Sequence, residues 1–441
     1  MIIFDARLES TLDKAVKAHC DLEKKSGVLA SPHFLIGTFA EGFDIHIAHI
    51  TKCPLPATAT ATGGDAASKT VDDQWLVESA EKVIRMLPGG IDLVGILWLS
   101  NKNIFIEQRP RLIKALSRIA KYSTALTTMK LFSYIENMVL VNVEIPLGKP
   151  QAVVVDVVNR SPESPTKVVF NKLEWVSIVS RAGGRISDHI ANLKTENFYN
   201  DFVDLLKPWA QRILDCNLIL VDGKVRETNE YLNKDPKNKK SSFELVLLTE
   251  SEGSDDSTTT LQQESTTNWH DFVFDIEIRA AVPVKSKVEF AVLATKQHII
   301  RNMCSRAVLH YESMEVTEDR GTGGSQIIHQ MPRPATTTLP YHSSILFSDF
   351  LFEADTIEDG QKNMKELLEI EASIEHVDDG WERALEVGEM EQVRAPGVVP
   401  DHLPLIISLQ EKQSRFWFYV MIIVSVLVLL ISIILYQVIK K

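Results

Sequence analysis

Residues 86–101 read MLPGGIDLVGILWLSN, and this stretch decides the fold. The Pro88-Gly89-Gly90 turn ends the element before it, because proline and glycine both interrupt regular structure. The segment that follows, IDLVGILWL (91–99), is an apolar run without polar alternation. A run of this kind is typical of a strand that is covered on both faces of a sheet.

The flanking segments complete an α/β pattern. Asp72 or Asp73 can cap a helix before the turn, and another helix follows the strand. Apolar residues share one face of each helix: Leu76, Ala80, Val83 and Leu87 in the first, and Leu112, Ile113, Leu116 and Ile119 in the second. Upstream, HFLIGTF (33–39) and FDIHIAHI (43–50) have the pattern of a β-hairpin. We therefore expect an α/β (α+β) domain over residues 1–220.

The rest of this domain and a second domain are predicted from shorter patterns. Strands are expected at 130–143, 152–158 and 167–179, a helix at 200–215, and a hairpin at Asp222-Gly223. A second small α/β domain is expected over 240–350, with a disordered insert at about 249–268. Its predicted elements are strands at 272–282 and 287–294 and a helix at 295–308. The acidic segment 351–412 is expected to be a solvated linker.

The segment 416–439, FWFYVMIIVSVLVLLISIILYQVI, carries no charge. At about 1.5 Å per residue, a helix over it is roughly 36 Å long and spans a hydrocarbon core of about 30 Å. The residues that define this anchor are Phe416, Trp417, Tyr419, Val428, Leu429 and Tyr436. The N-terminus has no secretory signal pattern, so the sequence predicts a tail anchor with the bulk of the chain in the cytosol and the C-terminus in the lumen.

Composition narrows the function classes further. The 441 residues have a formal net charge of −12, which argues against nucleic acid as the main partner. Four cysteines, at positions 20, 53, 216 and 304, form no CxxC pair, so neither a disulfide framework nor a cysteine zinc site is indicated.

The order of helix, hairpin, helix and buried strand resembles the MPN (JAMM) metalloprotease fold. Active members carry a His-x-His-Pro motif after this strand and a carboxylate further on, and these residues bind zinc. Here the resemblance places Trp98 and Ser100 at the histidine positions and Arg111 near the carboxylate position. An indole, a hydroxyl and a guanidinium cannot hold zinc in this way. The resemblance therefore implies a pseudoenzyme with no catalytic residues, metal or other cofactor.

The whole arrangement resembles the odorant response abnormal protein four family. The resemblance is carried by HFLIGTF (33–39), by DIHIAHITKCPLP (44–56), by residues 86–101 and by the terminal helix. It implies a non-enzymatic adaptor of the endoplasmic reticulum that helps multipass receptors, notably odorant receptors, to mature and reach cilia. It also implies a partnership with the cysteine protease of the ubiquitin-fold modifier. The alternatives are a membrane-anchored MPN metallohydrolase, a general tail-anchored scaffold and a fusion protein of the coiled-coil type.

Overall fold

The computed structural model describes most of residues 1–382 and none of 383–441. The described ranges are 1–26, 30–39, 44–54, 72–125, 136–145, 148–190, 198–234, 239–248, 268–314, 326–352, 354–380 and 382. Met1–Ala384 form one compact unit, and Leu385–Lys441 are a second. The predicted anchor at 416–439 and the insert at 249–267 lie outside the described residues.

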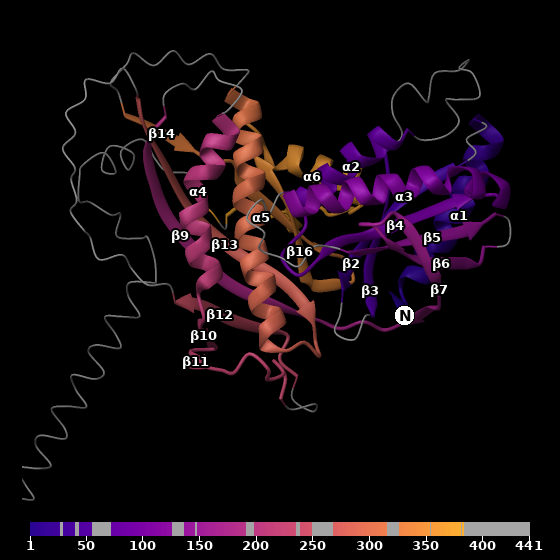
Figure 1. Ribbon diagram of the computed structural model, residues 1–441, viewed down its shortest axis with the longest axis horizontal. Coiled ribbons are helices and arrows are strands. Elements are labelled where there is room, and N and C mark those ends of the chain that lie inside the picture. Colours follow the sequence, from indigo (N-terminus) through magenta and orange to yellow (C-terminus); the bar gives the residue numbers. More distant parts are fainter. Residues whose placement is uncertain are drawn as a thin grey trace, which may run out of the picture. The chain divides into compact units, whose positions relative to one another are not determined.

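The first sheet of the described body has eight strands, in the order β7-β6-β5-β4-β2-β3-β1-β8 (Figure 1). Only Lys167 separates the two edge strands along the chain, so the sheet must curl to bring its edges near each other. The strands are β1 (Ile2–Asp5), β2 (Ala30–Phe39), β3 (Ile45–Lys52), β4 (Asp92–Ser100), β5 (Asn137–Glu144), β6 (Pro150–Asp156), β7 (Ser161–Thr166) and β8 (Val168–Asn171). The helices are α1 (Leu8–Ser26), α2 (Asp73–Arg85) and α3 (Lys102–Ala125).

Strand β4 is buried on both faces, as its apolar sequence predicts. Ile96 and Trp98 join the core cluster that includes residues of α2 and α3, whereas Leu97 and Leu99 join the cluster that includes α1. The strand pairs antiparallel with β2 and parallel with β5. Gly95 permits the second pairing, because a Cβ atom there would lie 2.1 Å from the Val139 carbonyl oxygen. The predicted hairpin is also confirmed, since β2 and β3 pair antiparallel.

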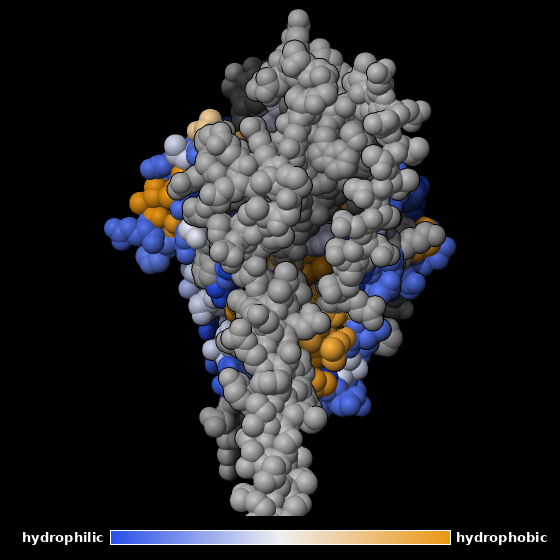
Figure 2. Space-filling model, turned by 90° about the vertical axis from the view of Figure 1, so that its left-hand side faces the viewer, coloured by the Kyte–Doolittle hydropathy of each residue, from blue (hydrophilic) through white to orange (hydrophobic). Residues whose placement is uncertain are grey.

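The second sheet of the described body has six strands, in the order β11-β10-β12-β9-β13-β14. Its elements are β9 (Trp175–Ile190), α4 (Phe198–Asp215), β10 (Leu218–Val221), β11 (Lys224–Val225), β12 (Ser242–Leu248), β13 (Asn268–Pro283), α5 (Val288–Met314) and β14 (Gln326–Gln330). Helices α4 and α5 lie side by side over β9 and β13 (Figure 1). The surface turned to the viewer in Figure 2 is largely hydrophilic where it is described, with hydrophobic residues gathered in a few small areas.

The boundary predicted at residue 220 falls inside this second sheet. Strand β9 lies before that boundary and pairs along its whole length with β13, which lies after it. The predicted hairpin at Asp222-Gly223 is present as β10 and β11. The run predicted as one strand at 167–179 is divided between β8 and the start of β9, and these belong to different sheets. Strand partners far apart in the sequence therefore define the sheets.

The predicted strand at 287–294 is wrong, because helix α5 begins at Val288. Val288, Ala291, Val292 and Ala294 are buried in this run, and so is Thr295 directly after it. Spacings of three, four and seven residues from Val288 put Ala291, Val292 and Thr295 on one helical face that packs against the second sheet. A short apolar run is compatible with both periods, and here the tertiary contacts decide for helix.

The prediction of a solvated linker from residue 351 is also wrong for its first part. Strands β15 (Arg333–Leu339) and β16 (His342–Leu351) lead into helix α6 (Ile357–Leu368) and the short 3-10 helix at Ile374–His376. Gly360, Met364 and Leu368 are buried on one side of α6, which leaves the acidic residues on the outside. The acidic composition concealed an amphipathic helix. Residues 383–412 of the predicted linker lie outside the described ranges.

Candidate functional site

The three positions predicted to have lost metal ligands do not form a site. Trp98 and Ser100 are buried on β4, and the Ser100 hydroxyl donates to the Asn101 carbonyl oxygen at 3.0 Å. Arg111 is exposed on α3, away from the core in which Trp98 and Ser100 are buried. Over the described ranges, the structure has no group of three or more His, Cys, Asp or Glu side chains that could hold a metal ion.

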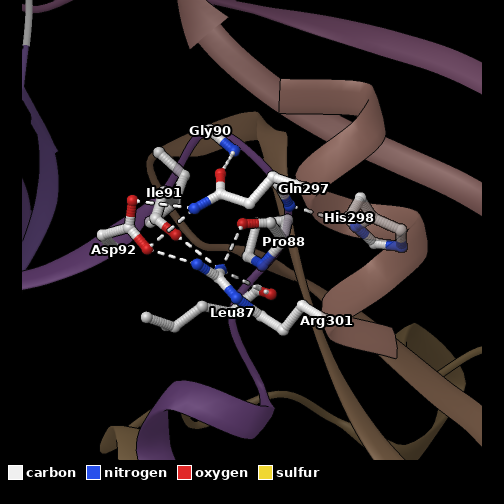
Figure 3. A network of polar contacts seen from close by, with 9 residues as sticks. Leu87, Pro88, Gly90, Ile91, Asp92, Gln297, His298 and Arg301 are labelled. Carbon is white, nitrogen blue, oxygen red and sulfur yellow. Dashed lines mark hydrogen bonds and ion pairs between the residues drawn. The ribbon is translucent and has the colours of Figure 1, made fainter. Parts of the chain in front are cut away.

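A buried polar network lies at the start of β4 and joins the first sheet to α5 (Figure 3). The Arg301 side chain is 4% exposed and pairs with the carboxylate of Asp92. Its Nη1 atom also donates to the carbonyl oxygens of the turn before β4: Leu87 at 3.3 Å, Pro88 at 3.1 Å and Ile91 at 2.8 Å. One guanidinium thus donates to three backbone carbonyls of this turn as well as to a carboxylate.

Two neighbours of Arg301 on α5 complete this network. Gln297 donates from Nε2 to both oxygens of Asp92, at 3.1 and 3.0 Å, and accepts from the Gly90 amide at 2.8 Å. The Gly89 amide donates to Nδ1 of His298 at 3.1 Å. The two glycines are required by space, because a Cβ on Gly89 would lie 1.9 Å from the Ala294 carbonyl oxygen. Gly90 also has a φ of +80°, which favours glycine.

A second buried cluster joins β1, β3, β16 and α6. His342 Nε2 lies 3.1 Å from the Asp5 carboxylate, and both residues are buried. His49 contacts the Tyr341 hydroxyl through Nδ1 at 2.9 Å, and its Nε2 lies 2.6 Å from the Leu368 carbonyl oxygen. Each polar atom of His49 therefore faces a fixed structural partner, which favours a structural role over a catalytic one.

Burial favours the neutral forms of several histidine and cysteine side chains in this core. It lowers the pKa of His298 to about 3, helped by the nearby Arg301 and Arg306 cations. It lowers the pKa of both His33 and His49 to about 4. Burial raises the pKa of the Cys53 and Cys304 thiols to about 12, so neither forms a thiolate nucleophile at neutral pH.

Sequence reasoning did not find the network around Arg301. It predicted the turn at 88–90 and the helix at 295–308, but not that they touch. The one signal was Asp92, an acidic residue at the start of an apolar strand, which requires a buried cation as partner. Nothing in the sequence identifies Arg301 as that partner, more than 200 positions away.

Fold and site together define a mixed α/β protein whose buried polar clusters are structural. The family model described as ODR4-like, Odorant response abnormal 4-like, matches residues 34–379. This chain therefore belongs to the odorant response abnormal 4-like family. It is 41% identical to Odorant response abnormal protein 4 of Caenorhabditis elegans, over 90% of this chain and 84% of that protein. Protein odr-4 homolog of Gallus gallus is 22% identical, over 71% of this chain and 74% of that protein.

One solved structure aligns with most of this chain, at low similarity. The crystal structure of UfSP from C. elegans aligns with a TM-score of 0.38 and 11% identity, over 83% of this chain and 56% of that chain. A TM-score of this size does not establish a shared fold. Within the described residues, no helix is both long and apolar enough to cross a membrane.

The buried histidines predict how stability depends on pH. Their folded pKa values lie near 3 to 4, whereas an unfolded histidine titrates near 6.5. The contribution of these histidines to the free energy of unfolding is complete above pH 6.5. It is lost as the pH falls below 6.5, because only the unfolded chain binds the proton. As the pH falls from 6.5 towards the folded pKa, each histidine should lower the free energy of unfolding by about 1.4 kcal/mol per pH unit. Urea unfolding of the full chain in detergent, repeated from neutral to mildly acidic pH, measures the slope.

The matched variant is His298→Asn, whose amide oxygen can still accept from Gly89. It should reduce the slope by about 1.4 kcal/mol per pH unit, the share of one histidine. An unchanged slope in the variant, or a wild-type stability that does not fall below pH 6.5, would contradict this account.

Proposed function

We propose that this chain is a non-enzymatic adaptor, anchored in the endoplasmic-reticulum membrane by residues 416–439. In this role it aids the folding, maturation and trafficking of multipass receptors, notably odorant GPCRs, to cilia. It also recruits the cysteine protease that is specific for the ubiquitin-fold modifier. The observation that carries the proposal is membership of the odorant response abnormal 4-like family, with 41% identity to the C. elegans protein.

Binding without catalysis is supported by the surroundings of β4. Zinc needs three or four ligands from histidine, cysteine or carboxylate side chains. Trp98 and Ser100 stand at the positions that the MPN resemblance assigns to histidines, and both are buried in the core. Arg111 is a cation on the surface of α3. This favours an MPN-like pseudo-metalloprotease domain over the alternative, a membrane-anchored metallohydrolase. A general tail-anchored scaffold, the other alternative, would share the anchor and the lack of catalysis.

The metal content separates the adaptor from the metallohydrolase. The full chain, expressed with added zinc and purified in detergent, should contain no stoichiometric zinc by elemental mass spectrometry. Chelators should leave its thermal unfolding midpoint unchanged, because no bound ion contributes to the folded state. Stoichiometric zinc, or peptidase activity that a chelator abolishes, would contradict the non-enzymatic adaptor and support the metallohydrolase.

The anchor is tested by removing or charging it. A chain that stops at Lys412 should become soluble and should no longer deliver a tagged odorant receptor to cilia in C. elegans that lacks its own Odorant response abnormal protein 4. Val428→Arg should weaken insertion by about 2.5–3.5 kcal/mol, because a guanidinium is costly at the centre of a bilayer. Membrane fractionation and imaging of the receptor are the measurements.

Val428→Leu is the control for this substitution and should insert normally. Glycan acceptors report the orientation of the same chain. The Asn159-Arg160-Ser161 sequon should stay unmodified on the cytosolic side, whereas an acceptor sequon added after Lys441 should be modified in the lumen. A truncated chain that still sediments with membranes, or sugar on Asn159, would contradict the proposed topology.

A further inference from the structure

A pocket of about 330 Å³ lies on the outer surface of the first sheet region, between α3 and the turn after β6. It is lined by Arg109, Pro110, Ile113, Lys114 and Arg160. We call these five residues the α3 pocket. Three of them are cations, and the other two are apolar and lie on the same helix. Such a concentration of positive charge is unexpected on a chain with a net charge of −12.

The three cations of the α3 pocket have no ionic partner in the part of the chain that the structure describes. The Nε atom of Arg109 is buried and donates no hydrogen bond there. By contrast Arg118, about one turn beyond Lys114 on the same helix, lies 3.9 Å from the carboxylate of Asp73. A surface that neutralised its charges for stability alone would pair these cations in the same way. The unpaired cations instead leave a positive potential over the pocket.

The turn that supplies Arg160 is rigidly held. The Asp156 carboxylate accepts from the amides of Val158 and Asn159, at 2.9 and 2.8 Å. The side-chain amide of Asn159 donates to the same carboxylate at 2.6 Å. Val157 is buried in the core beneath the turn. Arg160 itself has a φ of +56°, a left-handed conformation that non-glycine residues rarely adopt. The chain thus tolerates backbone strain at the residue that delivers a cation to the pocket.

Apolar surface accompanies the charge. Ile106, one turn before Pro110, is 61% exposed, and Val158, two residues before Arg160, is 52% exposed. Pro110 has no amide hydrogen, so the carbonyl of Ile106 lacks the donor that residue 110 supplies in a regular helix. The surface therefore offers hydrophobic contact and a hydrogen-bond acceptor next to the cations.

We propose that the α3 pocket and its apolar flanks dock an acidic segment of a partner protein, with a hydrophobic side chain of that segment in the pocket. This inference rests on the proposed adaptor function and names the chemistry of one partner. The charges pair with the cations, and the hydrophobic side chain packs on Pro110 and Ile113, which is the usual division between polar rim and apolar centre at interfaces. Three cations are fewer than the four to eight that typify a lipid-binding cluster.

The test is binding of a fluorescein-labelled peptide, EEDLFEDEE, to the full chain in detergent, followed by fluorescence anisotropy. The peptide should bind saturably and more weakly as salt is raised. Lys114→Glu combined with Arg160→Glu should weaken binding by about ten-fold or more, because both exposed cations are reversed. Val158→Ser should also weaken it. The matched control is Lys121→Glu, an exposed cation at the far end of α3, which should change the affinity by less than about two-fold.

Thermal unfolding of each variant shows that lost binding does not come from lost folding, since all these substitutions are at exposed positions. The peptide EEDGGEDEE, which lacks the hydrophobic pair, should bind more weakly than EEDLFEDEE. Absence of saturable binding, or equal losses in the double variant and in Lys121→Glu, would overturn the proposal. Vesicles of phosphatidylserine that bind through the same cations, while the peptide does not, would assign the pocket to lipid instead.

Besides a partner protein and a lipid, the test distinguishes a third outcome, in which the acidic segment of the chain itself fills the α3 pocket. If replacing Glu386, Glu389 and Glu391 by glutamine raised the peptide affinity about ten-fold, that segment would be the occupant and the partner proposal would fall. The outcomes also separate this inference from the adaptor proposal. Suppose that the peptide binds but the chain is not needed for receptor delivery. This result would contradict the adaptor proposal and still support the assignment of the pocket.

Discussion

The buried guanidinium of Arg301 joins helix α5, which packs on the second sheet, to the turn before β4, and the position of this central strand of the first sheet depends on it. A buried cation is tolerated only where its charge and its hydrogen-bond donors are matched. Asp92 supplies the charge, and the carbonyl groups of the turn before β4 take the remaining donors. Because these partners are the turn and the first residue of β4, the network fixes where the strand begins. Strands β2 and β5 then take their register from β4.

The C-terminal part of the described body adds a second tie between distant elements. The hydroxyl of Thr51 on β3 donates to the Leu367 carbonyl at the end of α6. Further on, Thr336 and Asp378 form a β-bridge, and the buried Glu382 pairs with Arg306 on α5. The segment therefore contacts β3, β15 and α5 in succession.

The sequence predicted the local elements better than their assembly. The buried character of β4, the β2–β3 hairpin and the helix before Pro88 follow from periodicity and turn residues, which are local properties. The prediction of a strand at the start of α5 was wrong, because Val288, Ala291 and Val292 lie on a helical face. Only the contacts of that face with the second sheet distinguish the helix from a strand. The helix at 357–368 was hidden by its acidic outer residues. The pairing of β9 with β13, and of Asp92 with Arg301, joins positions too far apart for a single sequence to indicate.

The α3 pocket was likewise invisible from the sequence. Arg109 and Lys114 belong to one helix, but Arg160 comes from a turn that follows two further strands, and only the folded sheet places it beside them. Of the predicted positions, Trp98 and Ser100 are core residues and Arg111 is exposed on α3. The predicted absence of a metal site at these positions remains a prediction, for which the measurement of zinc content is the test.

We expect Arg301 to make the two sheets one cooperative unit. Hydrogen exchange of the full chain in increasing urea, read by mass spectrometry on peptides from β4 and from β13, tests it most directly. In the unaltered chain, both peptides should lose protection together at one urea concentration. In Arg301→Gln, which leaves Asp92 buried without its cation, β4 should lose protection at lower urea than β13. Joint loss of protection at an unchanged urea concentration in the variant would contradict the claim.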